Sequence, residues 1–368
     1  MVKIDKLVIV ESKNIKDKIL YCLETLNFKP SSNEFVLKPN IVSKYKSGSG
    51  HITDIRIVES LIEILNENYD AKNIIIAEGP TLFLENPMEL FDYVGYTKLV
   101  KKYHNVSLLD IYQTSYKKNN NNFRVPEILE GRSLINLPVL KGHAQVGLTC
   151  AVKNLKGLLD RSDKKRFHRD GLHEHLSTLV NLKPELTLVD AITCQECEGD
   201  FLSKKYKFNL LICGKNPIII DDFCAKLVGF NVNEIPYLKM LIEKEPLNYE
   251  IIGDYEILAA WNAPRSKLSY GKIDVYGVDC CSHCVSALVQ YLVPKRLKNH
   301  KILGMTLRVI RSLFKKERTS YIMGRNMNMN ENVEGKVFLF GNCAKNLYPG
   351  EFIAGFPPAV YHNLRNVS

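Results

Sequence analysis

Short runs of consecutive apolar residues alternate with amphipathic stretches along the first two hundred or so residues. Strands are predicted where such runs stand between turn residues, at 34–39, 73–79, 134–138, 186–191 and 208–214. One amphipathic stretch has Thr53 as its expected helix cap and places apolar residues at helical spacing, at Ile57, Val58, Leu61, Ile62 and Leu65. Continuous apolar strands that alternate with helices favour an α/β fold, a mostly parallel sheet flanked by helices.

The pattern restarts after about residue 260. A strand is predicted at 272–279, a helix at 283–293 and a further strand at 336–342. The turn that contains Trp261 and Pro264 is the candidate boundary. We therefore predict an α/β domain over 1–262 and a smaller C-terminal α/β domain over 263–368, with a basic insertion at 295–335.

Length and composition support this division. A chain of 368 residues exceeds most single cores, and 45% apolar with 24% charged residues is ordinary for a globular protein, which excludes disordered and fibrous classes. The N-terminus lacks an apolar core of signal-peptide length, and no window approaches the roughly 20 apolar residues that cross a bilayer. We expect a cytoplasmic protein.

The net charge of +10 is concentrated in one segment. Residues 295–318 contain nine Lys or Arg and a single acid, Glu317, so this segment carries +8 (nine minus one) and the remainder is nearly neutral. That distribution argues against a nucleic-acid partner. Within the segment, Leu303, Leu307, Ile310 and Phe314 could form one helical face, which is typical either of a helix on an anionic membrane surface or of a solvated helix with a core-facing stripe.

The stretch from 134 to 160 has the strongest chemical pattern. A predicted strand leads into Lys141, His143, Lys153 and Lys156, which are interleaved with glycines and Thr149. Open α/β sheets place ligands where strands end in glycine-containing loops, and lysine offers a mobile charge for carboxylate or phosphate. Because the neighbouring residues are apolar and small, these charges need an anionic partner, either a ligand or an acid such as Asp190 or Glu78. The alternative is that the lysines are solvated loop and helix charges.

Histidines and paired cysteines are further candidates. His168, His173 and His175 do not have the i, i+4 spacing of a zinc helix, so His168 is better interpreted as a proton-transfer or substrate contact. Cys281 with Cys284, and Cys194 with Cys197, form Cys-x-x-Cys pairs, and Cys343 follows the last predicted strand. These thiols could bind a metal, act as a redox dithiol or be incidental.

Carboxylates also occur at strand ends, and several decisive motifs are missing. Asp221 and Asp222 follow a strand-like run, where they suit either a general base or a helix cap. The sequence contains no dinucleotide fingerprint, Walker A motif, Gly-x-Ser-x-Gly or ferredoxin-type cysteine run.

Together these motifs resemble the domain of unknown function 362 family over about residues 34–230. The resemblance is carried by FVLKPN, by LINLPVLKGHAQVGLTCAVKNLKGLLD, by RFHRDGLHEHL and by PIIIDDFCAKLVGF. Many members are described as iron–sulfur proteins because of a fused ferredoxin module, which this sequence does not contain. DCCSHCVSALVQYL is similar to a cysteine element that some members carry elsewhere. A more distant likeness to nickel-dependent lactate racemases adds nickel to iron–sulfur and zinc as candidate cofactors.

These observations lead to one working hypothesis and one alternative. We expect the protein to bind an anionic small molecule. The sequence leaves open a metal- or thiol-dependent oxidoreductase or isomerase reaction that involves a redox partner. The expected ligand-binding residues are Lys38, Asn40, Thr149, Lys153, Asn154, Lys156 and Asp190, the catalytic ones Lys141, His143 and His168, and the metal ligands Cys281, Cys284, Cys343, Cys194 and Cys197. The alternative is a non-catalytic peripheral membrane or assembly protein that uses residues 295–318.

Overall fold

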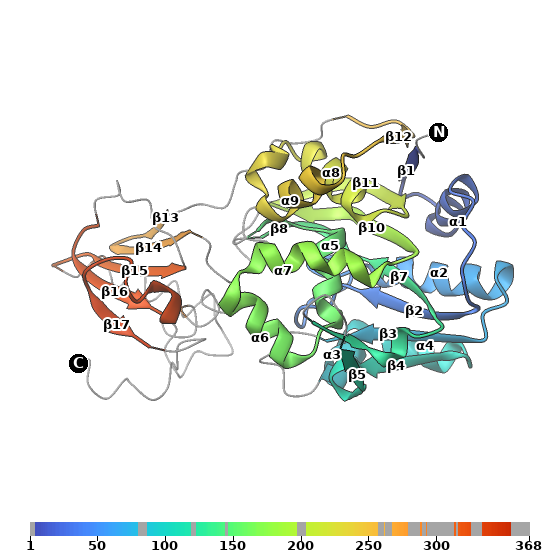
Figure 1. The fold of residues 1–368 in the computed structure, drawn as a ribbon, viewed down its shortest axis with the longest axis horizontal. Helices are drawn as coiled ribbons and strands as arrows, with labels where there is room; N and C mark the ends of the chain where they lie inside the picture. Colours follow the sequence, from blue (N-terminus) through green and yellow to red (C-terminus); the bar gives the residue numbers. More distant parts are fainter. Residues whose placement is uncertain are drawn as a thin grey trace. The chain divides into compact units, whose positions relative to one another are not determined.

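A computed structural model describes most of the chain as two compact units, Met1–Asn262 and Ala263–Ser368. The described residues are 4–79, 87–118, 123–143, 146–196, 204–256, 261, 267–278, 288, 292, 313, 316–324 and 333–354. Each unit is built around its own sheet (Figure 1). Among the described residues, no helix combines the length and the apolar character needed to cross a lipid bilayer.

The first unit contains a mixed, mostly parallel sheet. Its strand order is β12 (Tyr249–Ile252), β1 (Asp5–Glu11), β11 (Lys205–Gly214), β10 (Leu186–Gln195), β7 (Ser133–Leu137), β2 (Glu34–Pro39), β3 (Asn73–Glu78) and β4 (Val106–Asp110). Along this path only β11 runs antiparallel to its neighbours. β8 (Val139–His143) pairs with β10 and with the short β9 (Gly147–Thr149).

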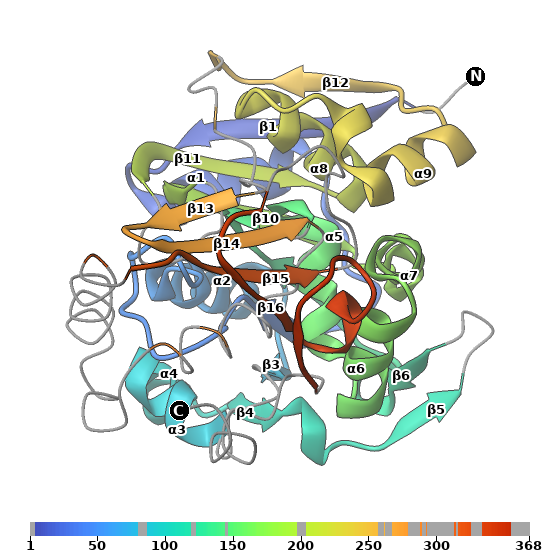
Figure 2. The ribbon, with the colours of Figure 1, turned by 90° about the vertical axis from the view of Figure 1, so that its left-hand side faces the viewer.

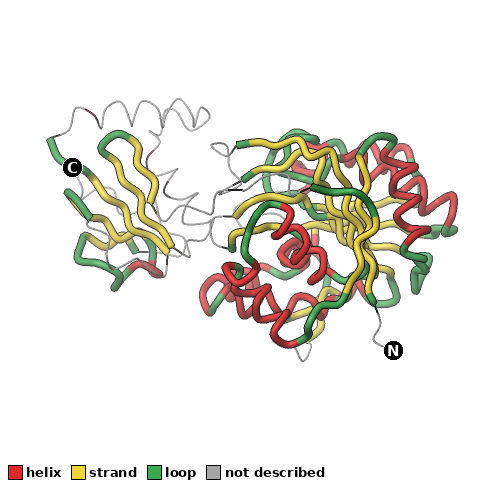
Figure 3. The backbone as a smooth tube through the Cα atoms, turned by 90° about the horizontal axis from the view of Figure 1, so that it is seen from above, coloured by secondary structure: helices red, strands yellow, loops and turns green. Residues whose placement is uncertain are grey.

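Helices cover both faces of this sheet (Figure 3). One face packs against α1 (Ile15–Thr25), α2 (Ile55–Asn68), α3 (Pro87–Val94) and α4 (Tyr96–Lys102). The other packs against α5 (Ala151–Asn154), α6 (Arg161–Asp170), α7 (Leu172–Thr178), α8 (Pro217–Leu227) and α9 (Pro236–Lys244). Successive strand residues point to opposite faces, so in β1 Leu7 and Ile9 join the second core while Val8 and Val10 join the first.

The second unit is a smaller five-stranded sheet (Figure 2). Its order is β13 (Lys267–Tyr270), β14 (Ile273–Val278), β15 (Thr319–Gly324), β16 (Lys336–Phe340) and β17 (Glu351–Ile353). β13 pairs antiparallel with β14, and the remaining pairs are parallel. The buried carboxylate of Asp274 accepts hydrogen bonds from the guanidinium of Arg318, both at 2.8 Å, which ties β14 to the start of β15.

The predicted α/β fold class is confirmed, and each strand predicted in the first unit is present. Two local predictions are wrong, because the strand-like run before Asp221 lies within α8 and because the cap of α2 is a different residue. Thr53 does not cap α2, because its hydroxyl donates to the carbonyl of Leu137 (2.6 Å) and accepts from the amide of Asn40 (2.8 Å). The cap is Asp54, whose side chain accepts from the amide of Arg56 (3.0 Å). Apart from Leu288 and Leu292, the predicted helix at 283–293 lies outside the described residues, as does most of the basic segment.

Candidate functional site

The site residues lie at the carboxyl ends of β2, β3 and β7, where the order of the strands reverses. The chain runs from β2 outward to β3 and β4, and then returns to place β7 on the other side of β2. Lys38 of β2 and Asn136 of β7 are paired in register at this point. A crevice at such a reversal is the usual ligand position in open α/β sheets.

A buried ion pair joins β2 and β3. The ammonium of Lys38 lies 2.6 Å from the carboxylate of Glu78 at the end of β3 and donates to the carbonyl of Pro39 at 2.6 Å. The same carboxylate accepts the amides of Ile41 (3.1 Å) and Gly79 (2.9 Å). Burial lowers the pKa of Lys38, while the charge of Glu78 acts in the opposite direction. Glu78 is therefore the acid partner that the sequence required for one of the lysines.

Buried amide side chains extend this pair toward α5. Asn154 donates to the carbonyl of Lys38 (3.0 Å) and to the side chain of Asn136 (2.8 Å), and it accepts from Asn40 (3.0 Å). Asn136 in turn donates to the carbonyl of Ala151 (2.9 Å). These contacts fix α5 against β2 and β7, so they set the position of Lys153, which precedes Asn154 on the same short helix.

Lys141 is buried on β8, where the described residues offer it neutral acceptors only. Its ammonium donates to the side-chain oxygen of Asn40 (3.0 Å) and to the carbonyl of His51 (2.6 Å). Burial, with the charge of Lys153 as the next cause, lowers the pKa of Lys141 to about 7. Near neutral pH this amine therefore exists in both protonation states.

Lys153 differs from the other described lysines of the cluster in how its charge is accommodated. It is half-buried, and its ammonium has no hydrogen-bond or ion-pair partner among the residues that the structure describes. Burial, followed by the charge of Lys38, lowers its pKa to about 8. Because the charge of Lys153 also lowers the pKa values of Lys141 and His143, these three side chains lie within electrostatic range of one another.

His143 is kept neutral by the same surroundings. Burial lowers its pKa well below the ordinary value, and the charges of Lys153, Lys156 and Lys141 contribute further. Its Nδ1 accepts the amide of Val146 (3.3 Å), which leaves the other ring nitrogen to carry the proton. The amine of Lys141, with a pKa of about 7, can therefore move a proton near neutral pH, and the neutral imidazole of His143 lies within electrostatic range of it.

Lys164 is a cluster residue that sequence reasoning missed. It extends from α6 to the carbonyls of Gly79 (2.5 Å) and Gly157 (3.0 Å) and to the hydroxyl of Tyr112 (2.9 Å). Burial lowers its pKa to about 7. Its sequence context is a strongly charged helix, DKKRFHRD, so nothing separates Lys164 from its solvated neighbour Lys165.

Asp190 and Asp221 bind backbone amides. Asp190 accepts the amides of Asp54 (2.8 Å) and Ile192 (3.0 Å), and burial raises its pKa to about 7. Asp221 lies inside α8, which is capped by Asn216. The carboxylate of Asp221 accepts the first two amides of α5, from Ala151 (2.6 Å) and Val152 (3.1 Å). Asp221 therefore caps a helix, although it is not the helix that follows it.

The predicted metal ligands are only partly described. Cys194 is buried on β10, where burial raises the pKa of its thiol, and Cys343 is half-buried in a short turn after β16. Cys197, Cys281 and Cys284 lie outside the described residues, as does the side chain of His168. Within the described part of the chain, no group of three or more His, Cys, Asp or Glu side chains could hold a metal ion.

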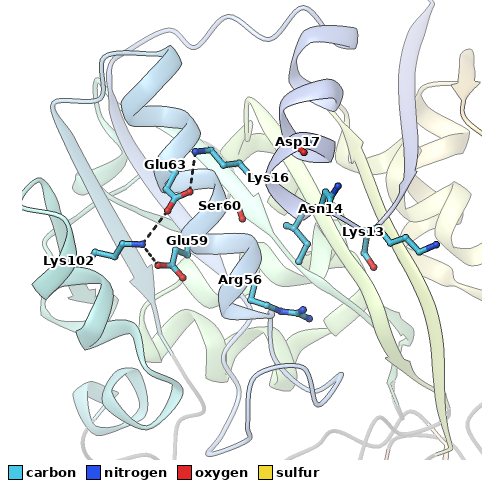
Figure 4. Close-up of a pocket in the computed structure, with 11 residues that line it drawn as sticks. Lys13, Asn14, Lys16, Asp17, Arg56, Glu59, Ser60, Glu63 and Lys102 are labelled. Carbon is cyan, nitrogen blue, oxygen red and sulfur yellow. Dashed lines mark hydrogen bonds and ion pairs between the residues drawn. The ribbon is translucent and has the colours of Figure 1, made fainter.

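A hollow of about 750 Å³ opens on the surface beside α1 and α2, away from the lysine cluster (Figure 4). Its charges are largely matched. Lys16 and Lys102 both pair with Glu63 (3.2 and 3.3 Å), and Lys102 also pairs with Glu59 (2.8 Å). This pairing distinguishes the hollow from the cluster around Lys153.

Comparisons with known proteins identify the family. The model "Domain of unknown function (DUF362)" matches residues 36–226, and the chain belongs to this family. A "Thylakoid-associated protein" from Synechocystis is 22% identical over 226 residues, which is 57% of this chain and 67% of that protein.

Two solved structures are similar at low identity. The lactate racemase apoprotein from Thermoanaerobacterium thermosaccharolyticum is 14% identical with a TM-score of 0.41, over 64% of this chain and 58% of that one. The chain thus spans less than two thirds of that enzyme's length. A protein from Thermotoga maritima is 10% identical with a TM-score of 0.39, over 92% of this chain and 90% of that one.

A substitution at Gly157 tests whether the ion pair between Lys38 and Glu78 is tightly enclosed. A Cβ at this position would collide with the side chains of Lys38 and Glu78. We expect Gly157→Ala to lower the free energy of unfolding by about 1–3 kcal/mol, because the ion pair must shift. Urea denaturation measures this. Gly131→Ala is the control, since open space surrounds Gly131 and only its positive φ of 67° imposes a cost, about 1 kcal/mol. A smaller loss for Gly157→Ala than for the control would contradict this packing.

The lowered pKa of Lys164 predicts a pH-dependent stability. Between about pH 7 and its ordinary value of 10.5, Lys164 is neutral when folded but protonated when unfolded, so unfolding takes up a proton and stability rises with pH. Lys164 contributes at most about 1.4 kcal/mol per pH unit to the slope of the unfolding free energy against pH. Between pH 7 and 9, Lys164→Met should flatten the rise in unfolding free energy, whereas the exposed Lys165→Met should not. Identical slopes for both variants would refute the assignment.

Proposed function

We propose that this protein binds an anionic small molecule, a carboxylate or a phosphate, at the lysine cluster on the carboxyl edge of the first sheet. The observation that carries the proposal is the ammonium of Lys153, which has no partner among the described residues. Of the described acids, Glu78 ion-pairs with Lys38, whereas Lys141 is held only by neutral oxygens. A bound anion would offset this excess of half-buried positive charge.

The proposed chemistry is proton transfer on the bound anion. The pKa of Lys141 is about 7, so its amine can take up and release a proton near neutral pH, whereas the strongly lowered pKa of His143 keeps its imidazole neutral. A proton-transfer isomerisation can use such groups alone, whereas the metal- or thiol-dependent version of an oxidoreductase or isomerase reaction also requires cysteines. The predicted ligands for that version remain Cys194, Cys197, Cys281, Cys284 and Cys343.

Binding of inorganic phosphate and of succinate, measured by isothermal titration calorimetry, tests the proposal. We expect at least one to bind saturably at pH 7, and Lys153→Gln to weaken that affinity about 10- to 100-fold through loss of a charge-assisted hydrogen bond. Affinity should also fall as the pH rises past 8, where Lys153 loses its charge.

The control variant is Lys165→Gln, which removes an exposed lysine and should leave the affinity unchanged. Equal affinities of wild type and Lys153→Gln, or no saturable binding of either anion to the wild type, would rule out the proposed site.

A second candidate function is attachment to an anionic membrane surface through residues 295–318. Within that segment, Leu313 is 55% exposed and Lys316 is exposed. The similarity to a protein named for its association with thylakoids is in line with this candidate. It is compatible with a ligand site in the first unit, because the segment belongs to the second.

Vesicle flotation tests the membrane candidate. Wild-type protein should float with vesicles of anionic phosphatidylserine and phosphatidylcholine at low salt, because each basic residue near such a surface contributes roughly 1 kcal/mol. A variant in which Arg308, Arg311 and Lys315 are replaced by Gln should float less, and neither protein should bind pure phosphatidylcholine. Negligible flotation of the wild type would dismiss this candidate.

A further inference from the structure

Three polar side chains form a row across neighbouring strands at the proposed site. Lys141 on β8 is directly opposite Thr149 on β9 and is also paired with Gln195 on β10. Residues paired across adjacent strands point to the same face of a sheet, so the three side chains stand side by side with Lys141 in the middle. His143, two residues after Lys141, points to the same face.

The two outer members of this row each have a buried polar atom without a hydrogen-bond partner. Among the described residues, neither the hydroxyl of Thr149 nor the side-chain oxygen of Gln195 makes a hydrogen bond, although these residues are only 2% and 0% exposed. An unsatisfied buried polar group typically costs about 1–3 kcal/mol, so native proteins rarely leave two together without a use.

The orientation of the Gln195 amide identifies what is missing. Its nitrogen donates to the carbonyl of Ser49 (3.1 Å), so the atom left over is the oxygen, which can only accept. The loop that contains Ser49 also contains His51, whose carbonyl accepts a hydrogen bond from the ammonium of Lys141. Beside the cations of the cluster there is thus a fixed acceptor, which requires a donor from the ligand.

We propose that the anion bound at this site carries a hydroxyl group close to its carboxylate or phosphate. This inference rests on the proposed function. The anionic group lies against Lys153 and Lys141, the ligand hydroxyl donates to the side-chain oxygen of Gln195, and Thr149 donates its own hydroxyl proton to the anion. Gln195 and Thr149 are therefore specificity-determining residues that distinguish hydroxylated anions from their unsubstituted analogues.

Matched pairs of ligands test this class. Malate and succinate carry the same charge and differ by one hydroxyl, and glycerol 3-phosphate and propyl phosphate give the corresponding comparison for phosphates. In calorimetric titrations at pH 7, we expect the hydroxylated member of at least one pair to bind at least about tenfold more tightly than its unsubstituted analogue. A site built to hydrogen-bond a hydroxyl discriminates strongly against the analogue that lacks it.

Two variants connect the preference to the row. Gln195→Met removes the acceptor at similar volume and should bring the affinity ratio of the pair close to one, with binding of the unsubstituted anion little changed. Thr149→Val should weaken both members of the pair, because it removes a donor to the shared anionic group. A matched control is Thr187→Val, which removes another buried hydroxyl without a described partner, eight residues earlier on β10 and roughly 25 Å from Gln195.

The outcomes separate the two proposals. If both members of each pair bind equally and both depend on Lys153, the anion site stands and the hydroxyl inference is wrong. The inference is also wrong if the preference survives in Gln195→Met, since a buried water would then account for the oxygen. If no anion of either pair binds the wild type, the proposed function itself fails. Circular dichroism of each variant establishes that a loss of binding does not reflect unfolding.

Discussion

The buried ion pair between Lys38 and Glu78 is the constraint on which the first unit depends. Two opposite charges with side chains only 1% and 4% exposed are stable there only when their remaining hydrogen-bonding capacity is satisfied. The amides of Ile41 and Gly79 and the carbonyl of Pro39 meet that need. The ion pair therefore fixes the ends of β2 and β3 and, through the contacts of Asn154, the short helix that carries Lys153.

The distribution of charge around this pair explains why the cluster is a candidate site rather than a structural network alone. Lys164 satisfies its three protons with two carbonyls and a tyrosine hydroxyl, and Lys38 has its own acid. Lys153 has no such partner in the described part of the chain. The charge of Lys153 lowers the pKa of Lys141, and the charge of Lys38 lowers the pKa values of both, so the positive charges of the cluster are only partly compensated by the described residues.

Apolar runs along the chain were sufficient to predict β2, β3, β7, β10 and β11, because a strand covered on both faces must be apolar throughout, but they did not reveal β1, β4, β8, β9 or β12. The meeting of Lys141, His143 and Lys153 could also be anticipated from the glycine-rich segment that contains them. The positions of Gln195 and Lys164 could not be anticipated, because only the fold brings their partners near. Gln195 donates to the carbonyl of Ser49, and Lys164 donates to the carbonyl of Gly79. The helix cap was misplaced by one residue because Thr53 and Asp54 are both competent caps, and only the nearby carbonyl of Leu137 decides between them.

The capping of α5 by Asp221 has a consequence for how the protein is made. A four-residue helix cannot persist by itself, and the carboxylate that holds its first amides is supplied from α8, some 70 positions later in the chain. During synthesis, the segment with Lys153 therefore has to wait for α8 to leave the ribosome before it can settle. The proposed binding site is consequently completed late, well after most strands of its sheet have been translated.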